Sequence, residues 1–145
     1  MRPRLFENVI CPKELYWLYT ELLATQGWTL NAHARPAPGL DRIFPTIGNL
    51  HIEPGMKWFD YFQGLVFRIK QTADKEKVGM NYKIARVFIN ATFSDSITKL
   101  HTDNDGERPV HSLLVFLTPV WQDSWLGSFW VDGNEYKFKP GNVVY

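Results

Sequence analysis

The chain has 145 residues, the length of a single domain. Aromatic residues make up 15% of it, so it has ample apolar area with which to build a sizeable core. Sixteen basic and fifteen acidic residues leave a formal charge of +1. This balance gives no electrostatic footprint for nucleic acid or for a membrane surface, and we expect neither as a partner.

The cysteine count and the distribution of apolar residues indicate in which cellular compartment the protein works. Cys11 is the single cysteine, which excludes an internal disulfide and a cysteine-based zinc site. No apolar run approaches the roughly 20 residues of a membrane-spanning helix. The first residues, Met1 to Glu7, lack the apolar core of a signal peptide. We therefore predict a soluble, cytoplasmic protein.

The first half of the chain predicts two helices. A short strand is expected over residues 4–10, and a helix over 12–25, between Pro12 and Gly27. Residues 31–55 are rich in proline and glycine, so loops are expected there, with short strands at 43–44 and 50–52. A second helix follows Gly55 and closes near Gly79. Its core stripe comprises Trp58, Tyr61, Phe62, Leu65 and Ile69.

The second half of the chain predicts strands. Residues 82–90 alternate in a way typical of a strand. Further short β segments follow from residue 97, with a hairpin turn at residues 132–134 and a Pro140-Gly141 turn into a last strand at 143–145. Helices in front and consecutive strands behind predict an α+β domain, an antiparallel sandwich or barrel with helices on one face. No linker divides the chain.

Two residues within the strand-rich half have the chemistry of metal ligands. In extended backbone, residues two apart point to the same side, so His101 and Asp103 can direct an imidazole nitrogen and a carboxylate oxygen at one point. Together with one more histidine, they would form the two-histidine, one-carboxylate facial triad that binds iron(II) and leaves positions open for a cosubstrate and oxygen. The bare spacing is weak evidence by itself, and its context decides its meaning.

That context consists of an ordered series of segments. The motif His101-x-Asp103 is followed by the apolar run 112–117, Trp121, the segment 127–130 and the stretch 140–145. Over about residues 82–145 this order resembles the 2-oxoglutarate/iron(II)-dependent dioxygenases, most closely the prolyl-4-hydroxylase-like branch. The resemblance implies a double-stranded β-helix of jelly-roll or cupin-like type. Residues 1–80 would be mainly helical support, and residues 81–145 would be the β core.

The resemblance also implies the cofactors and the site. Iron(II) would be held by His101 and Asp103, with 2-oxoglutarate and O2 as cosubstrates and no further catalytic residue. The family carries a second metal histidine shortly after the Pro-Gly strand, and then a basic residue that binds 2-oxoglutarate. Both would fall beyond Tyr145, so we expect these 145 residues to be truncated, with the C-terminal strands missing, and inactive alone. His111 is an alternative third ligand, although it stands in the wrong order for the family pattern.

The strand before the motif supplies candidates for binding 2-oxoglutarate. Asn90 alternates in phase with Arg86 and Phe88. In the resembling family a polar side chain from this strand often contacts 2-oxoglutarate, which makes Asn90 the first candidate and Arg86 the second. The competing interpretation is that both are ordinary outward-facing strand residues. His33 and His51 are expected to be surface or loop histidines, and Trp121 and Trp125 to serve in packing.

Two other functions remain open from the sequence. The β region could be a non-catalytic jelly-roll module that binds a carbohydrate or a peptide, with His101-x-Asp103 as a polar turn. It could also be a degenerate oxygenase fold that acts as a partner protein. For an enzyme, the substrate would be a small molecule or a peptide. The sequence leaves its identity and the oligomeric state open.

Overall fold

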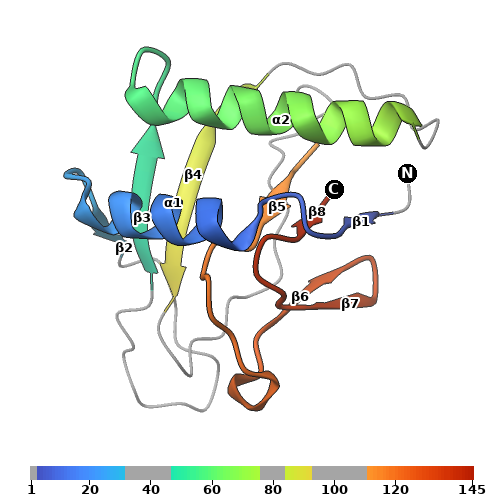
Figure 1. Ribbon diagram of the computed structural model, residues 1–145. Coiled ribbons are helices and arrows are strands. Elements are labelled where there is room, and N and C mark those ends of the chain that lie inside the picture. Colours follow the sequence, from blue (N-terminus) through green and yellow to red (C-terminus); the bar gives the residue numbers. More distant parts are fainter. Residues whose placement is uncertain (1–2, 32–46, 76–83, 93–110) are drawn as a thin grey trace. The chain divides into compact units, whose positions relative to one another are not determined.

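The structure is a computed structural model that describes residues 3–31, 47–75, 84–92 and 111–145 (Figure 1). The chain divides into two compact units, one formed by Met1–Thr25 with Asp103–Tyr145 and the other by Gln26–Thr102. In the described residues, the first unit combines an α-helix with two small antiparallel sheets and the second combines an α-helix with one, so the composition is mixed α and β. The single domain and the double-stranded β-helix expected from the sequence stay predictions.

The first unit contains the predicted N-terminal helix, α1 (Pro12–Ala24). Proline is at its first position, where the missing N–H costs no helical hydrogen bond, and the backbone N–H of Thr25 closes the last turn on Leu22 O at 3.1 Å. Leu15, Leu18 and Leu22 recur at helical spacing and are buried. The predicted helix over 12–25 is confirmed within one residue.

A three-stranded antiparallel sheet lies at the heart of this unit, in the order β1 (Leu5–Phe6), β8 (Val143–Val144), β5 (Leu114–Val115). The last strand therefore lies between the first strand and the strand that follows the His101–Asp103 region. The core here contains Phe6, Phe116, Val143 and Val144, all buried. Strand β1 is shorter than the predicted 4–10, because Asn8 adopts a positive φ of 54° that ends the extended backbone.

The predicted hairpin is confirmed as β6 (Ser128–Val131) and β7 (Asn134–Lys137). Asp132 and Gly133 join the strands with φ of 48° and 76°, the two positive values that a two-residue type I′ turn requires. A short 3-10 helix, η1 (Asp123–Trp125), precedes the hairpin. The expected strand at 112–117 pairs as a strand only over β5, and the expected strand after Pro140-Gly141 is β8.

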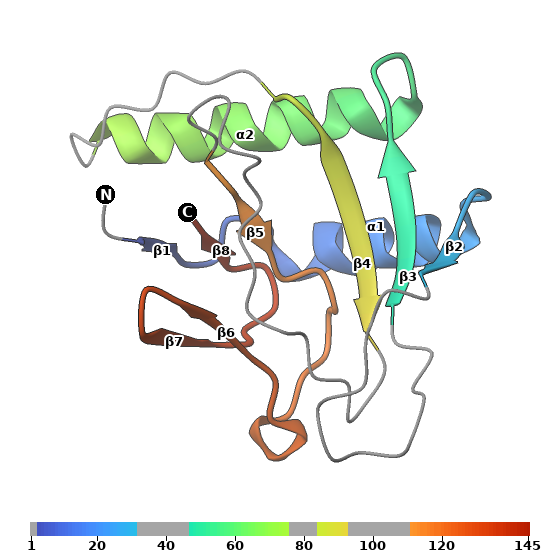
Figure 2. The same ribbon diagram turned by 180° about the vertical axis from the view of Figure 1, so that it is seen from behind.

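The second unit contains the antiparallel sheet β2 (Thr29–Asn31), β3 (Ile47–Ile52), β4 (Val87–Thr92), and the helix α2 (Lys57–Lys75). Helix α2 lies on one side of the β3–β4 pair, in front of the strands in Figure 1 and behind them in Figure 2. The predicted second helix is confirmed, and its buried side chains are Trp58, Phe59, Phe62, Leu65, Ile69 and Ala73. Phe59 replaces the predicted Tyr61 in this stripe, since Tyr61 is only half-buried.

The sheet of the second unit has one buried and one exposed face. Leu50, Ile52 and Ile89 are buried, and Leu50 lies opposite Ile89 in the register. Their neighbours along the strands, His51, Phe88 and Asn90, are exposed because successive strand residues point to opposite sides. Among the described residues, neither helix is long and apolar enough to cross a membrane. The predicted strand at 43–44 and residues 82–83 of the predicted strand at 82–90 lie outside the described residues, whereas residues 84–86 are described and precede the strand, which begins at Val87.

Candidate functional site

The predicted metal ligands His101 and Asp103 lie outside the residues that the structure describes, as does His33. Their assignment as ligands therefore stays a prediction. Within the described ranges 3–31, 47–75, 84–92 and 111–145, no group of three or more His, Cys, Asp or Glu is placed to hold a metal ion. In the part of the chain that the structure describes, β4 comes before the motif in the sequence and β5 comes after it.

The segment after the motif pairs directly with the end of the chain. Leu114 lies opposite Val144 and Val115 opposite Val143 in the antiparallel β5–β8 ladder. Just beyond this ladder, the rings of His111 and Tyr145 stack with their centroids 5.6 Å apart and an interplanar angle of 23°. Tyr145 therefore lies beside His111, the first described residue after the motif. His111, the alternative third ligand, is exposed and precedes β5.

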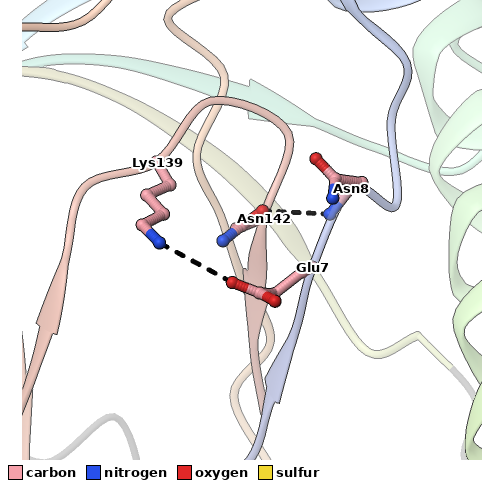
Figure 3. Close-up of polar contacts among 4 residues, drawn as sticks. All are labelled: Glu7, Asn8, Lys139 and Asn142. Atoms are coloured by element: carbon pink, nitrogen blue, oxygen red, sulfur yellow. Dashed lines mark hydrogen bonds and ion pairs between the residues drawn. The ribbon is translucent and has the colours of Figure 1, made fainter.

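The turn that leads into β8 is held by the N-terminal segment, as Figure 3 shows. Asn142 is 2% exposed, and its Oδ1 accepts a hydrogen bond of 3.0 Å from the backbone N–H of Asn8. The carbonyl oxygen of Gly141 accepts from the N–H groups of Val9 and Ile10 at 3.0 and 3.3 Å. The exposed Lys139 and Glu7 side chains form an ion pair of 3.7 Å beside this turn. Position 142 was not among the candidates from the sequence, because a buried asparagine cannot be told from a turn asparagine by its neighbours alone.

Asn90 and Arg86 are on the exposed face of the second unit's sheet. Asn90 is a solvent-exposed residue of β4 and lies opposite Asn49 in the β3–β4 register. Arg86 precedes β4, and its guanidinium carbon lies 5.2 Å from the centroid of the Phe88 ring, within the range of a cation–π contact. Both candidates for 2-oxoglutarate binding therefore flank Phe88 on this face. Their role in binding 2-oxoglutarate stays a prediction.

His51 belongs to the same face, which the sequence did not indicate. It is opposite Phe88 in the register, and the two rings meet edge-on with centroids 4.1 Å apart and an interplanar angle of 67°. His51 is exposed, as expected, and it is in β3, which confirms the predicted strand at 50–52 and extends it back to residue 47. The alternation of Asn49 and His51 with the buried Leu50 and Ile52 is the pattern that could have revealed this, had the strand been extended back from residue 50.

The predicted packing role of Trp121 fits its surroundings. Its ring stacks on Phe138 with centroids 4.1 Å apart, and its Nε1–H donates to the carbonyl oxygen of Leu126 at 2.9 Å. A Cβ atom on Gly127 would be 2.6 Å from the indole Cζ2, so only glycine fits beside this ring without a shift. The Trp125 ring meets that of Trp121 in a T-shaped arrangement with centroids 5.6 Å apart, but Trp125 is 52% exposed, so it is only partly packed.

Comparison with known proteins finds no family model, no characterised protein and no solved structure that matches this chain.

Proposed function

We propose that this chain carries the site of an iron(II)- and 2-oxoglutarate-dependent oxygenase that hydroxylates a C–H bond of a small molecule or peptide in the cytoplasm. The observation that carries the proposal is the order of segments around His101-x-Asp103. A strand precedes the motif, an apolar strand follows it, and a Pro-Gly turn leads into a further strand. The antiparallel pairing of β5 with β8 supports it, because it joins the segment after the motif to the strand after the Pro-Gly turn.

The donor chemistry of the motif fits iron(II). An imidazole nitrogen from His101 and a carboxylate oxygen from Asp103 are ligands that non-haem iron(II) accepts in facial-triad sites. With 2-oxoglutarate and O2, the metal would supply the oxidising chemistry, in which 2-oxoglutarate is decarboxylated to succinate and the substrate is hydroxylated. The resembling family also uses a second metal histidine and a basic residue. Within residues 1–145, His111 is the alternative candidate for the second metal histidine, and no residue is assigned the role of the basic residue that binds 2-oxoglutarate.

The role of this chain's other residues is to bind and orient. Asn90 presents an amide with two N–H donors on the exposed face of β4, which is the chain segment that leads toward the motif. Such an amide can donate hydrogen bonds to a carboxylate of 2-oxoglutarate and fix its orientation. In this proposal Asn90 is the main contact, and Arg86 is the second candidate.

The test is the formation of succinate from 2-oxoglutarate by the complete protein of the natural gene, supplied with iron(II). His101→Ala should abolish it, because the metal would lose one of its protein ligands. His33→Ala changes a histidine of the proline- and glycine-rich stretch 31–55 that forms no part of the family pattern, so it serves as the matched control and should retain turnover. Succinate formation that persists in the His101→Ala protein would overturn the ligand assignment.

A second candidate function is a non-catalytic module that binds a carbohydrate, and one specific feature favours it. Trp130 on the β6–β7 hairpin is 52% exposed, and its indole Nε1–H is fixed by a 3.1 Å hydrogen bond to Ser128 Oγ. The cross-strand partner Glu135 is exposed beside it. An indole held in place beside a carboxylate can offer apolar contact and a hydroxyl acceptor to a sugar. Iron-independent binding of oligosaccharide, lost in Trp130→Ala, together with no succinate formation, would favour this function.

A further inference from the structure

The segment that leads from β5 into the β6–β7 hairpin exposes an apolar and aromatic surface around η1 (Figure 1). Val120, Trp125 and Leu126 are 60%, 52% and 79% exposed. Between residues 112 and 131, Asp123 is the single charged side chain. Neither a packing role for the tryptophans nor the proposed oxygenase function accounts for exposed aromatic surface beside a carboxylate.

The ring of Trp121 is fixed from three directions. Phe138 stacks on it with centroids 4.1 Å apart, and its Nε1–H donates to the carbonyl oxygen of Leu126 at 2.9 Å. Gly127 lies so close to the six-membered part of the indole that an added Cβ would be 2.6 Å from Cζ2. A ring that is already held in place loses little conformational freedom when a ligand packs against it.

The ring of Trp125 stands almost at a right angle to that of Trp121. The two centroids are 5.6 Å apart, and the interplanar angle is 82°. A ligand group that packs into the angle between two such rings lies within about 6 Å of both centroids, the range over which an aromatic ring attracts a cation. Trp125 is half exposed, so solutes have access to it. We call this arrangement the Trp121–Trp125 corner.

Asp123 supplies negative charge beside the corner. It belongs to η1 together with Trp125, and it is exposed. Among the described residues, no ion pair or side-chain hydrogen bond engages the Asp123 carboxylate. No lysine or arginine of those residues lies over the ring of Trp121 or Trp125. The aromatic surface is therefore not occupied by a cation from the described part of the chain.

The basic residues next to Phe138 in the sequence have acidic neighbours of their own. Lys139 forms the 3.7 Å ion pair with Glu7. Lys137 is on the exposed side of β7, and Glu135 is on the same side of that strand two residues earlier. Neither lysine removes the negative charge of η1, so a ligand that complements the corner carries positive charge and apolar surface.

The backbone of Leu126 indicates that the corner is held at a cost in stability. This exposed leucine has φ 59° and ψ −131°, a conformation that residues other than glycine rarely adopt. The same residue provides the carbonyl oxygen that fixes the indole of Trp121. Strained backbone of this kind is concentrated at binding and catalytic sites, where the surrounding structure maintains it.

We propose that the Trp121–Trp125 corner, with Asp123 beside it, binds the quaternary ammonium group of a small molecule. The methyl groups of such a cation are apolar and pack on the rings, while its positive charge is attracted by both rings and by the carboxylate. A primary ammonium group is strongly hydrated and would lose water at this surface. Binding here requires neither iron nor 2-oxoglutarate, so it is a further property of the chain beyond the proposed oxygenase function.

The test measures binding of three probes of similar size to the complete protein. Choline carries the quaternary ammonium group, dimethylbutanol is its neutral carbon isostere, and ethanolamine has the charge without the methyl groups. Ligand-observed NMR and the indole N–H resonances of the tryptophans follow each titration. Choline should bind about tenfold more tightly than either of the others. Phosphatidylcholine vesicles form a separate arm, in which we expect no cosedimentation of the protein.

Variants locate the binding to the corner. Trp125→Leu keeps an apolar side chain but removes one ring, and it should weaken choline binding about tenfold. Asp123→Asn should weaken it about threefold, and less at high salt. Tyr16→Leu removes an exposed aromatic ring from α1 in the same unit and should leave the affinity unchanged.

Three results would overturn the proposal. One is equal affinity for choline and dimethylbutanol, which would show that the charge is not recognised. Another is unchanged choline affinity in Trp125→Leu, with the remaining indole resonances at their native positions. The third is cosedimentation with phosphatidylcholine vesicles without binding of free choline, which would assign the exposed surface to a lipid bilayer.

Discussion

The backbone N–H of Asn8 donates a hydrogen bond of 3.0 Å to Oδ1 of Asn142, a residue 134 positions later in the chain. The bond fastens the N-terminal segment to the turn before β8, and Asn142 is buried while making it. Asn8 follows β1 and has a positive φ of 54°, and its N–H is bonded to this side-chain acceptor. The Asn142 side chain thus adds to the two hydrogen bonds that the Gly141 carbonyl accepts from Val9 and Ile10 in holding the start of the central strand.

Asn142→Ala is expected to lower the free energy of unfolding by about 1–3 kcal/mol, since the Asn8 N–H would lose its acceptor at a partly buried position. Glu7→Gln is the matched control from the same cluster. It breaks only the exposed Lys139–Glu7 ion pair, which contributes about 0–1 kcal/mol. Urea unfolding of the complete protein measures both values. Equal losses in the two variants would show that the Asn8–Asn142 bond does not have this structural role.

Gly141→Ala should be more destabilising than the same change at Gly133, although both glycines have φ of 76°. A Cβ at position 141 would overlap the carbonyl oxygen of Ile10, whereas no atom lies within 4 Å of a Cβ at position 133. We expect a loss of about 3 kcal/mol at Gly141, from the backbone conformation and the overlap together. At Gly133 only the conformational cost of about 1–2 kcal/mol applies. Thermal melts of the two variants compare them directly, and a similar loss in both would contradict the close approach of residues 141 and 10.

The sequence predicted those elements whose causes are local. Pro12 and the leucine spacing that follows it define α1, and Asp132-Gly133 defines the β6–β7 hairpin, because a fixed φ or a positive φ acts on its own neighbours. The partners of the strands were beyond this reasoning. Nothing near Leu5 indicates that it pairs with Val144, since the choice of partner depends on packing between distant segments.

The same distinction applies to the candidate site. The alternation that puts Asn90 in phase with Phe88 is local, and it correctly predicted that the two share a face. The contact between His51 and Phe88 depends on the register of β3 with β4. The sequence did not predict this register, because β3 lies in a region rich in proline and glycine. The assignment of His101 and Asp103 rests on the order of segments around them, and it stays a prediction.

Leu126 offers a case in which a smaller side chain should stabilise the protein. This leucine is 79% exposed and has φ 59° and ψ −131°, a backbone conformation suited to glycine. Leu126→Gly should raise the free energy of unfolding by about 1 kcal/mol net, after the greater freedom of glycine in the unfolded chain is counted. Leu126→Ala removes the same exposed side chain but keeps the conformational cost, so it should change stability little. Both variants keep the carbonyl that accepts from Trp121, and a stability gain from alanine equal to that from glycine would rule out backbone strain as the cause.

Asn90→Ala is expected to raise the KM for 2-oxoglutarate about tenfold in the complete protein, because loss of an amide donor to a carboxylate costs about 1.4 kcal/mol. Asn90 is exposed, so its removal should leave the melting temperature nearly unchanged, and the effect on KM reports binding and not folding. Gln63→Ala, which removes an exposed amide from α2 in the same unit, is the control and should leave KM unchanged. Succinate formation measured over a range of 2-oxoglutarate concentrations gives KM and kcat for each protein. An unchanged KM in Asn90→Ala, with turnover intact, would mean that Asn90 is an ordinary outward-facing strand residue and that 2-oxoglutarate is bound elsewhere.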